Sequence, residues 1–317
     1  MSLMRLFLLC LCLSLQITGA AAQTAESAAD HTFRSGVANV RIDVQVTDGG
    51  DLVRDLTQSD FAVFDEGRLQ PLVYFGRDAE PLSLILLIDA SGSMREYVEQ
   101  VAAVARQSLR HLRSGDRVSV MSFARDARVH LDWTDRVSEV AQELRSAAGD
   151  QSLGAGTNIN DALVAAAKHM AATAGPTGRR AVLILTDNLG LNYQSPDAPV
   201  IDAMNAAETV VNAIVVGKGR RPEPVPGGIY RNPDFTVPDV FTISEQTGGE
   251  AVKVTKAGQA FATMIERIRM RYALHYNVPE GAAPGKFRKV EVSLTQQARA
   301  RYPNAVLRHR PGYRTGS

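Results

Sequence analysis

The stretch that decides the fold is Leu84-Ile-Leu-Leu-Ile88 followed by Asp89-Ala-Ser91-Gly-Ser93. The first five residues form an uninterrupted apolar run, which is typical of a strand buried on both faces of a parallel sheet. A carboxylate and two hydroxyls follow within five residues, where the strand ends. These hard oxygen ligands suit Mg²⁺, Mn²⁺ or Ca²⁺ rather than a metal that prefers thiolates. The stretch therefore predicts a divalent cation held by oxygen atoms at one edge of a sheet.

The segment 82–270 alternates strand and helix patterns. Ala181–Thr186 and Val210–Val216 are further apolar strands, Ala251–Val254 is a short one, and Ala127–Trp133 is expected at an edge. Helices are expected from Val98 to Leu112 and over 137–147, 159–172, 200–207, 241–246 and 261–270. Strands with two apolar faces between amphipathic helices predict an α/β fold, with a doubly wound, mostly parallel, Rossmann-like sheet. Lys218–Pro238 contains five prolines and is expected to be a long surface loop.

The flanking segments 37–81 and 271–317 show strand patterns instead. Val40, Ile42 and Val44 alternate with polar residues, so one face of this strand is expected to be buried. Further strands are expected at Phe61–Phe64 and Leu72–Phe75, around the turn 65–67, and at Tyr272–Val278, Phe287–Leu294 and Ala305–Arg308. Unpaired strands at both ends would leave exposed edges. We therefore expect the two flanks to pack as one small β-sandwich into which the α/β domain is inserted.

Residues 1–22 resemble a secretory signal peptide. Arg5 supplies a short positive region, Leu6–Leu15 an apolar core, and Ala20-Ala-Ala22 a cleavage site before Gln23. The apolar core is too short to span a bilayer, and no later run is long enough. We therefore expect an exported protein, periplasmic or extracellular, with a flexible leader over 23–36 and no transmembrane segment in the mature chain.

Charge and cysteine content exclude several functions. The 317-residue chain has a formal net charge of +1, and residues 1–22 contain one basic and no acidic residue, so the rest is formally neutral. No strong field would attract nucleic acid or a charged membrane. Both cysteines, Cys10 and Cys12, lie in the predicted signal peptide. The mature chain would have no disulfide, thiolate metal site or cysteine nucleophile, and nothing in the pattern indicates an oligomeric state.

Two further groups are expected at the same edge as Asp89, because ligands of open α/β sheets bind at the carboxyl ends of strands. Asp187 follows the apolar strand that ends at Thr186, and Thr157 lies in a glycine-containing loop before a helix. A cation of this class takes about six oxygen ligands. Hydroxyls of Ser91, Ser93 and Thr157, carboxylates of Asp89 and Asp187, and water could supply them.

These three elements together resemble the von Willebrand factor type A domain and its metal-ion-dependent adhesion site. The matching residues are Asp89-x-Ser-x-Ser93, Gly156-Thr-Asn158 and Leu185-Thr-Asp187. The stretches Val40–Val44, Leu56–Phe61 and Arg310–Tyr313 also look like the secreted bacterial proteins described as Acidobacterial VWFA-related. The resemblance to the von Willebrand factor type A domain covers about residues 82–270, and these three stretches lie on either side of it.

The resemblance implies roles for these residues. Ser91, Ser93 and Thr157 would contact the cation directly or through water, and Asp89 and Asp187 would often act through water. Few anions on the metal would leave it positive, with an open position for an Asp or Glu of a partner protein. One departure is Asn188, which replaces a common Gly, but Asn tolerates left-handed backbone.

Three alternatives remain. Ser91 or Ser93 could instead cap the helix that follows. A metal-dependent hydrolase is the enzymatic alternative, although Ser91 lies in no Gly-x-Ser-x-Gly motif and the six histidines are scattered, with His130 the one that could approach the site. A scaffold that binds partners without metal is the third. We favour a non-enzymatic adhesion or assembly module.

Overall fold

The computed structural model describes residues 39–77, 80–147, 150–174, 178–190, 192–223 and 234–315. The predicted signal peptide (1–22) and leader (23–36) lie outside these residues. Within the described part, no helix is long and apolar enough to cross a membrane.

A six-stranded sheet forms the centre of the α/β part, with the order β13-β11-β9-β6-β7-β8. Its strands are β6 (Leu82–Asp89), β7 (Arg117–Phe123), β8 (Ala127–Thr134), β9 (Arg179–Thr186), β11 (Thr209–Val215) and β13 (Ala251–Lys253). All pairs are parallel except that of β7 with the edge strand β8. The predicted fold class is confirmed, including the edge position of β8.

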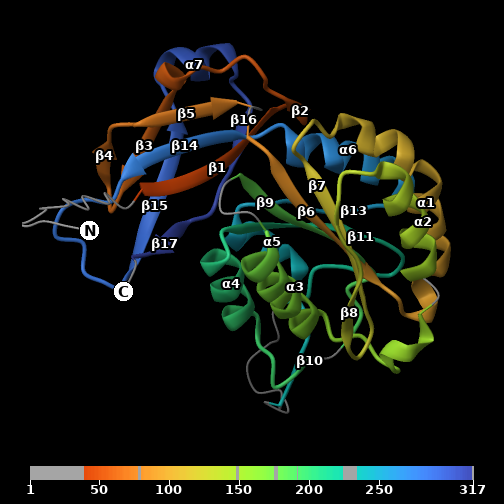
Figure 1. Ribbon diagram of the computed structural model, residues 1–317. Helices are drawn as coiled ribbons and strands as arrows, with labels where there is room; N and C mark the ends of the chain where they lie inside the picture. Colours follow the sequence, from red (N-terminus) through yellow and green to blue (C-terminus); the bar gives the residue numbers. More distant parts are fainter. Residues whose placement is uncertain are drawn as a thin grey trace, which may run out of the picture. The chain divides into compact units, whose positions relative to one another are not determined.

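Helices cover both faces of this sheet (Figure 1). Helices α1 (Arg95–Ser108), α2 (Val137–Ala147) and α6 (Ala257–Arg269) pack on one face, and α3 (Ile159–Thr173), α4 (Asp197–Ala206) and α5 (Val240–Thr247) on the other. The apolar run explains this arrangement, because alternate side chains of a strand point to opposite faces. Leu84, Leu86 and Ile88 join the first cluster, and Ile85 and Leu87 the second.

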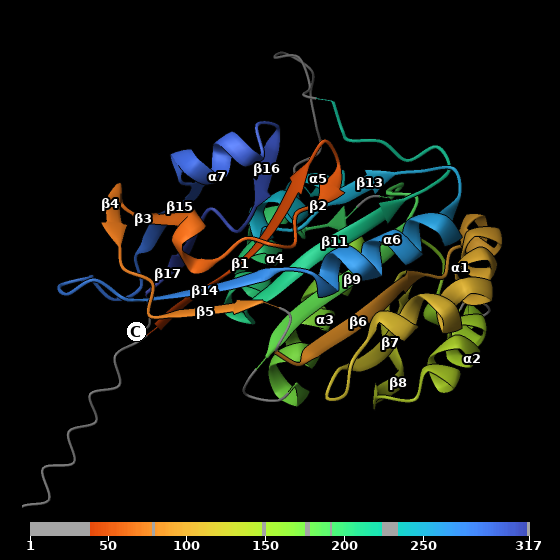
Figure 2. The same cartoon turned by 90° about the horizontal axis from the view of Figure 1, so that it is seen from above.

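The two flanks of the chain form a β-sandwich, as the alternating patterns predicted. One sheet has the order β16-β1-β14-β5, with β2 beside β1, and the other has the order β17-β15-β3-β4. The N-terminal flank contributes β1 (Asn39–Asp48), β2 (Asp51–Leu52), β3 (Phe61–Asp65), β4 (Arg68–Gln70) and β5 (Tyr74–Arg77). The C-terminal flank contributes β14 (Tyr272–Asn277), β15 (Phe287–Leu294), α7 (Gln296–Arg301), β16 (Ala305–Arg308) and β17 (Gly312–Arg314). Figure 2 shows β14 running between β1 and β5.

Residues of both flanks share the core of the sandwich. Ile42, Val44 and Val63 of the first flank and Leu274 and Tyr276 of the second are fully buried in one apolar cluster. Neither flank could bury these side chains alone, because each sheet contains strands from both ends of the chain.

Two expected elements differ from the structure. The turn 65–67 connects β3 to β4, whereas Tyr74–Arg77 pairs with β14 in the opposite sheet, so Leu72–Phe75 is not the second strand of that hairpin. The expected loop Lys218–Pro238 contains a short strand, β12 (Phe235–Thr236), which pairs with β10 (Asn192–Tyr193). Both differences involve strands of two to four residues, which are too short for a period of two to identify.

Candidate functional site

Asp89 ends the central strand β6 and is fully buried. Its Oδ1 accepts a hydrogen bond from the Ser91 backbone N–H at 3.0 Å, and its Oδ2 accepts one from the Thr186 hydroxyl at 2.8 Å. The neighbours β9 and β7 lie on the two sides of β6, so the chain changes direction here across the sheet. This switch point, at the carboxyl ends of the strands, is where open α/β sheets bind ligands.

Asp187 follows β9 and lies beside the serine loop. The Ser93 hydroxyl donates to Asp187 Oδ2 at 2.8 Å, and the Leu189 N–H donates to Oδ1 at 3.1 Å. Asn188 has a φ of +50°, so its backbone is in the left-handed conformation. Glycine is common at this position, and Asn is one of the few other residues that adopt this conformation readily. Its N–H donates to the Thr186 hydroxyl at 3.0 Å. The Asn therefore preserves the turn that aims Asp187 at the serine loop.

The two serines do not cap the helix that follows. Helix α1 begins at Arg95 after a single 3-10 turn, Gly92–Met94, and the side chain of Ser91 makes no capping hydrogen bond. The Ser91 and Ser93 hydroxyl oxygens lie 3.3 Å apart, and Ser93 points to Asp187. The helix-cap interpretation of these hydroxyls is therefore wrong.

Thr157 lies beside the loop that carries Asp187. A Cβ placed on Gly190 would come 2.4 Å from the backbone oxygen of Thr157 and 3.2 Å from its Cβ, so only glycine allows this approach. The next residue, Asn158, caps α3 by accepting the Asp161 N–H. Within the described residues, the Thr157 hydroxyl has no hydrogen-bond partner and is not bonded to either carboxylate. Of the five predicted residues, four are linked in one hydrogen-bonded group, and Thr157 borders it.

The electrostatics of this group favour an additional positive charge. Burial raises the pKa of Asp89 to about 6, although hydrogen bonds from Ser91 and Thr186 favour its charged form, and the nearby charge of Asp187 adds to the rise. A cation between these side chains would offset both the burial of the charged Asp89 carboxylate and its repulsion by Asp187. The donor set of two carboxylates and three hydroxyls contains only oxygen, which suits Mg²⁺, Mn²⁺ or Ca²⁺. The residues present therefore fit a divalent cation.

The site uses few carboxylates. In the part of the chain that the structure describes, no three His, Cys, Asp or Glu side chains come together as a metal cluster. Asp89 and Asp187 are the two acids of this group, and serine and threonine hydroxyls supply its other side-chain oxygens.

Thr186 is the residue that the sequence patterns missed. It is fully buried, donates to Asp89 and accepts from Asn188, so it joins β6 to the loop after β9. The sequence feature that could have identified Thr186 is its position at the end of an apolar strand, directly before Asp187.

The hydrolase alternative receives no support from the serine–histidine contacts. Ser122 Oγ lies 2.6 Å from His130 Nε2, and Ser119 Oγ lies 3.2 Å from His169 Nε2. Both serines are fully buried within β7, so neither oxygen can meet a substrate. His130 Nε2 also lies 3.5 Å from Asp150 Oδ2, and its Nδ1 lies 3.7 Å from Glu143 Oε1. These contacts are those of a structural histidine between β7, β8 and α2.

An oxygen-rich group at the switch point of a doubly wound sheet occupies the position where α/β domains of this class bind their ligands. Residues 84–190, from β6 to the loop after Asp187, match the von Willebrand factor type A domain family. The chain therefore contains a von Willebrand factor type A domain, a type of domain that typically mediates protein interactions.

Comparisons with other proteins give similarities at low identity. No curated protein matches the sequence. An aerotolerance-related membrane protein of Bacteroides fragilis is 20% identical over 59% of this chain and 98% of its own, with a TM-score of 0.44. BatB of Bacteroides thetaiotaomicron is 22% identical over 59% of this chain and 97% of its own, with a TM-score of 0.42. A von Willebrand factor type A protein of Catenulispora acidiphila is 13% identical over 90% of this chain and 76% of its own, with a TM-score of 0.45.

Proposed function

We propose that this protein binds an acidic residue of another protein through a divalent cation held by Asp89, Ser91, Ser93, Thr157 and Asp187. The observation that carries the proposal is the Ser93–Asp187 hydrogen bond of 2.8 Å, which brings the loops after β6 and β9 together beside Asp89. We further propose export of the chain, on the composition of residues 1–22.

The balance of charge supports recognition of a carboxylate. With neutral hydroxyls as its direct side-chain ligands and Asp89 and Asp187 acting through water, a bound cation would keep its positive charge, so it would attract an additional anionic ligand. Arg95 and Lys218 are exposed next to the site, and within the described residues neither has a hydrogen-bond or ion-pair partner. Lys218 follows Gly217, where an added Cβ would lie 3.9 Å from Asp187 Cβ. These charges would favour the approach of an acidic surface.

Calorimetric titration with Mg²⁺ and Mn²⁺ tests the cation. We expect one site in the wild-type chain, and affinity at least about tenfold weaker in Asp89→Ala and Ser93→Ala, since each removes an oxygen or its orientation. Ser93 is exposed, so Ser93→Ala should leave the fold intact even where Asp89→Ala does not. Ser138→Ala, another exposed serine on α2, is the matched control and should bind as wild type.

Affinity unchanged in both site variants would disprove the cation site. A partner captured equally well with and without EDTA would instead support the metal-independent scaffold. Turnover of an ester or phosphoester that Ser91→Ala abolishes would favour the hydrolase.

A further inference from the structure

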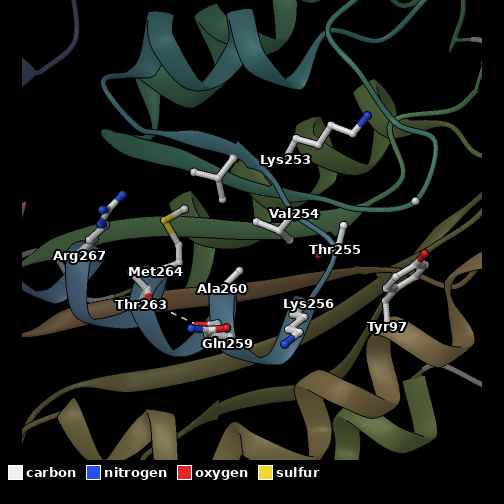
Figure 3. Close-up of a pocket in the computed structure, with 12 residues that line it drawn as sticks. Tyr97, Lys253, Val254, Thr255, Lys256, Gln259, Ala260, Thr263, Met264 and Arg267 are labelled. Atoms are coloured by element: carbon white, nitrogen blue, oxygen red, sulfur yellow. Dashed lines mark hydrogen bonds between the residues drawn. The ribbon is translucent and has the colours of Figure 1, made fainter. Parts of the chain in front are cut away.

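A hollow of about 720 Å³ lies between β13, α6 and the first turn of α1. We call it the β13–α6 groove. Figure 3 shows Tyr97 of α1 facing the segment Val254–Lys256 across it, with Ala260, Met264 and Arg267 of α6 along its length. β13 is an edge strand, so among the described residues no further strand closes this side of the sheet.

Positive charge dominates the lining of the groove. The described lining includes Lys253, Lys256 and Arg267, and it includes no acidic residue. Arg267 is already engaged, because its Nη1 donates to Glu250 Oε1 at 2.7 Å. Lys253 and Lys256 are exposed, and neither has a partner within the part of the chain that is described. The Lys253 side chain points away from Val254 and Met264 (Figure 3), so Lys256 is the unpaired cation nearest the floor of the groove.

The start of α6 adds to this charge. Lys256 occupies the N-cap position, its side chain makes no cap, and the first turn contains no acidic residue. A helix N-terminus carries a partial positive charge, which acidic side chains normally balance. Lys256 instead adds a positive charge at the positive end of the helix, which is unfavourable. Gln100 Oε1 accepts the Ala257 N–H at 3.2 Å, but this neutral group does not balance the charge of Lys256. Such local conflicts occur at functional sites, and here a carboxylate from outside would balance that charge.

The floor of the groove is apolar. Val252, Val254 and Met264 line it, and all three also pack against the core beneath α1 and α6. An apolar side chain of a ligand could therefore be buried there, next to Lys256.

The groove meets the candidate cation site at Gly217. This residue has a φ of +60°, and a Cβ at this position would lie 3.5 Å from the Tyr97 hydroxyl and 3.9 Å from Asp187 Cβ. Tyr97 and Gly217 line the groove, and Asp187 belongs to the site. One ligand segment can thus contact both.

We infer that the β13–α6 groove binds the acidic segment of the partner protein whose carboxylate reaches the cation site. This inference rests on the function proposed above. A second carboxylate of the segment lies at Lys256 and the start of α6, and an apolar side chain of the segment lies on Val252, Val254 and Met264. Charge complementarity selects an acidic peptide, and continuity through Gly217 selects the same partner as the cation site.

Selection from a displayed library of random peptides with one fixed Asp, against the full chain in Mg²⁺, tests the inference. We expect enrichment of a second acid and a large apolar residue. Fluorescence anisotropy of the most enriched peptide then gives Kd for each variant. Lys256→Glu should weaken binding on the order of tenfold, because a favourable charge pair becomes a repulsive one. Lys256→Gln should weaken it less, and Lys168→Glu, an exposed lysine on α3, should have no effect.

Each outcome separates the groove from the cation. Unchanged Kd in Lys253→Glu and Lys256→Glu, with binding lost in EDTA and Asp89→Ala, would overturn the groove and retain the proposed function. Weakened binding in the lysine variants without any effect of EDTA would retain the groove and overturn the cation bridge. No enrichment would overturn both. Binding to phosphatidylglycerol vesicles that Lys256→Glu abolishes would assign the groove to a membrane surface and overturn the peptide.

Discussion

The Thr186 hydroxyl donates to Asp89 Oδ2 at 2.8 Å and accepts the Asn188 N–H at 3.0 Å. One buried side chain thus fixes the orientation of the Asp89 carboxylate and the turn that precedes Leu189. Groups that orient metal ligands contribute to affinity although they do not touch the metal. Thr186 is therefore a positioning residue of the candidate site.

We expect Thr186→Val to weaken Mg²⁺ binding by roughly tenfold. Valine has the same shape as threonine, so the fold should persist, but Asp89 Oδ2 loses its donor and the Asn188 N–H loses its acceptor. Calorimetric titration measures the affinity, and Thr186→Ser, which keeps the hydroxyl, is the control and should bind as wild type. Equal affinity in the Val and Ser variants would show that Thr186 does not position the site.

The sequence predicted Asp89, Ser91, Ser93 and Asp187 at one edge, because Asp89 and Asp187 come at the ends of apolar strands and both serines lie in the loop after Asp89. It could not identify Thr186, whose contact with Asp89 depends on the register of β6 against β9, in which Ile88 pairs with Leu185. Register between distant strands is not encoded in either strand alone. The raised pKa of Asp89 was hidden for the same reason, since burial and the approach of Asp187 cause it.

At the scale of elements, one buried carboxylate connects the two sheets of the sandwich. Asp65 ends β3 and is fully buried. It accepts hydrogen bonds from Tyr276 of β14 and Tyr313 of β17, both at 2.9 Å, and from Arg288 Nε of β15 at 2.8 Å. Burial, followed by the charge of Asp65, raises the pKa of both tyrosines, which keeps them protonated as donors.

We expect Asp65→Ala to lower the free energy of unfolding by about 3–5 kcal/mol, because it leaves a partly buried Arg288 and two buried hydroxyls without their acceptor. Urea denaturation followed by circular dichroism measures the change. Asp51→Ala, at an exposed Asp of β2, is the matched control, and its effect should stay within about 0.5 kcal/mol. A similar small loss in both variants would mean that Asp65 does not hold the sheets together.

The sequence pattern predicted long strands more accurately than short ones. The strands β6, β9 and β11 have seven or eight residues, and their apolar runs marked them within a residue or two. The pairs β10 with β12 and β3 with β4 involve strands of two or three residues on at least one side. Their pairing comes from the turns and from tertiary packing, which a local pattern does not contain.

At the scale of the whole molecule, a group of charges joins the sandwich to the α/β domain. Asp43 of β1 is 9% exposed, and Arg41 donates to its two oxygens at 3.1 and 3.2 Å. Arg179, the first residue of β9, lies 3.7 Å from Asp43 Oδ1, and Arg271, between α6 and β14, donates to the Asp43 backbone oxygen at 3.2 Å. The insertion of one domain into the other is therefore stabilised by Asp43, whose carboxylate lies beside two arginines and whose backbone oxygen accepts a hydrogen bond from a third.

This arrangement determines how stability depends on pH. Burial disfavours the charged carboxylate, but Arg41, Arg179 and Arg271 outweigh it and lower the pKa of Asp43 to about 2, from 3.8. Between these values the unfolded state binds more protons than the native state, so the free energy of unfolding rises with pH. The contribution is fully present above pH 3.8 and is lost as pH falls through about 2. Its size is on the order of 2 kcal/mol.

We therefore expect the difference in unfolding free energy between wild type and Asp43→Asn to shrink by on the order of 2 kcal/mol between pH 5 and pH 2. Other carboxylates also titrate in this range, so the difference between the two proteins isolates Asp43. Urea denaturation at several pH values measures it, with Asp135→Asn, an exposed Asp of the α/β domain, as the control. A difference that is constant with pH would mean that Asp43 carries no lowered pKa and that the arginines hold the two domains together through backbone oxygens alone.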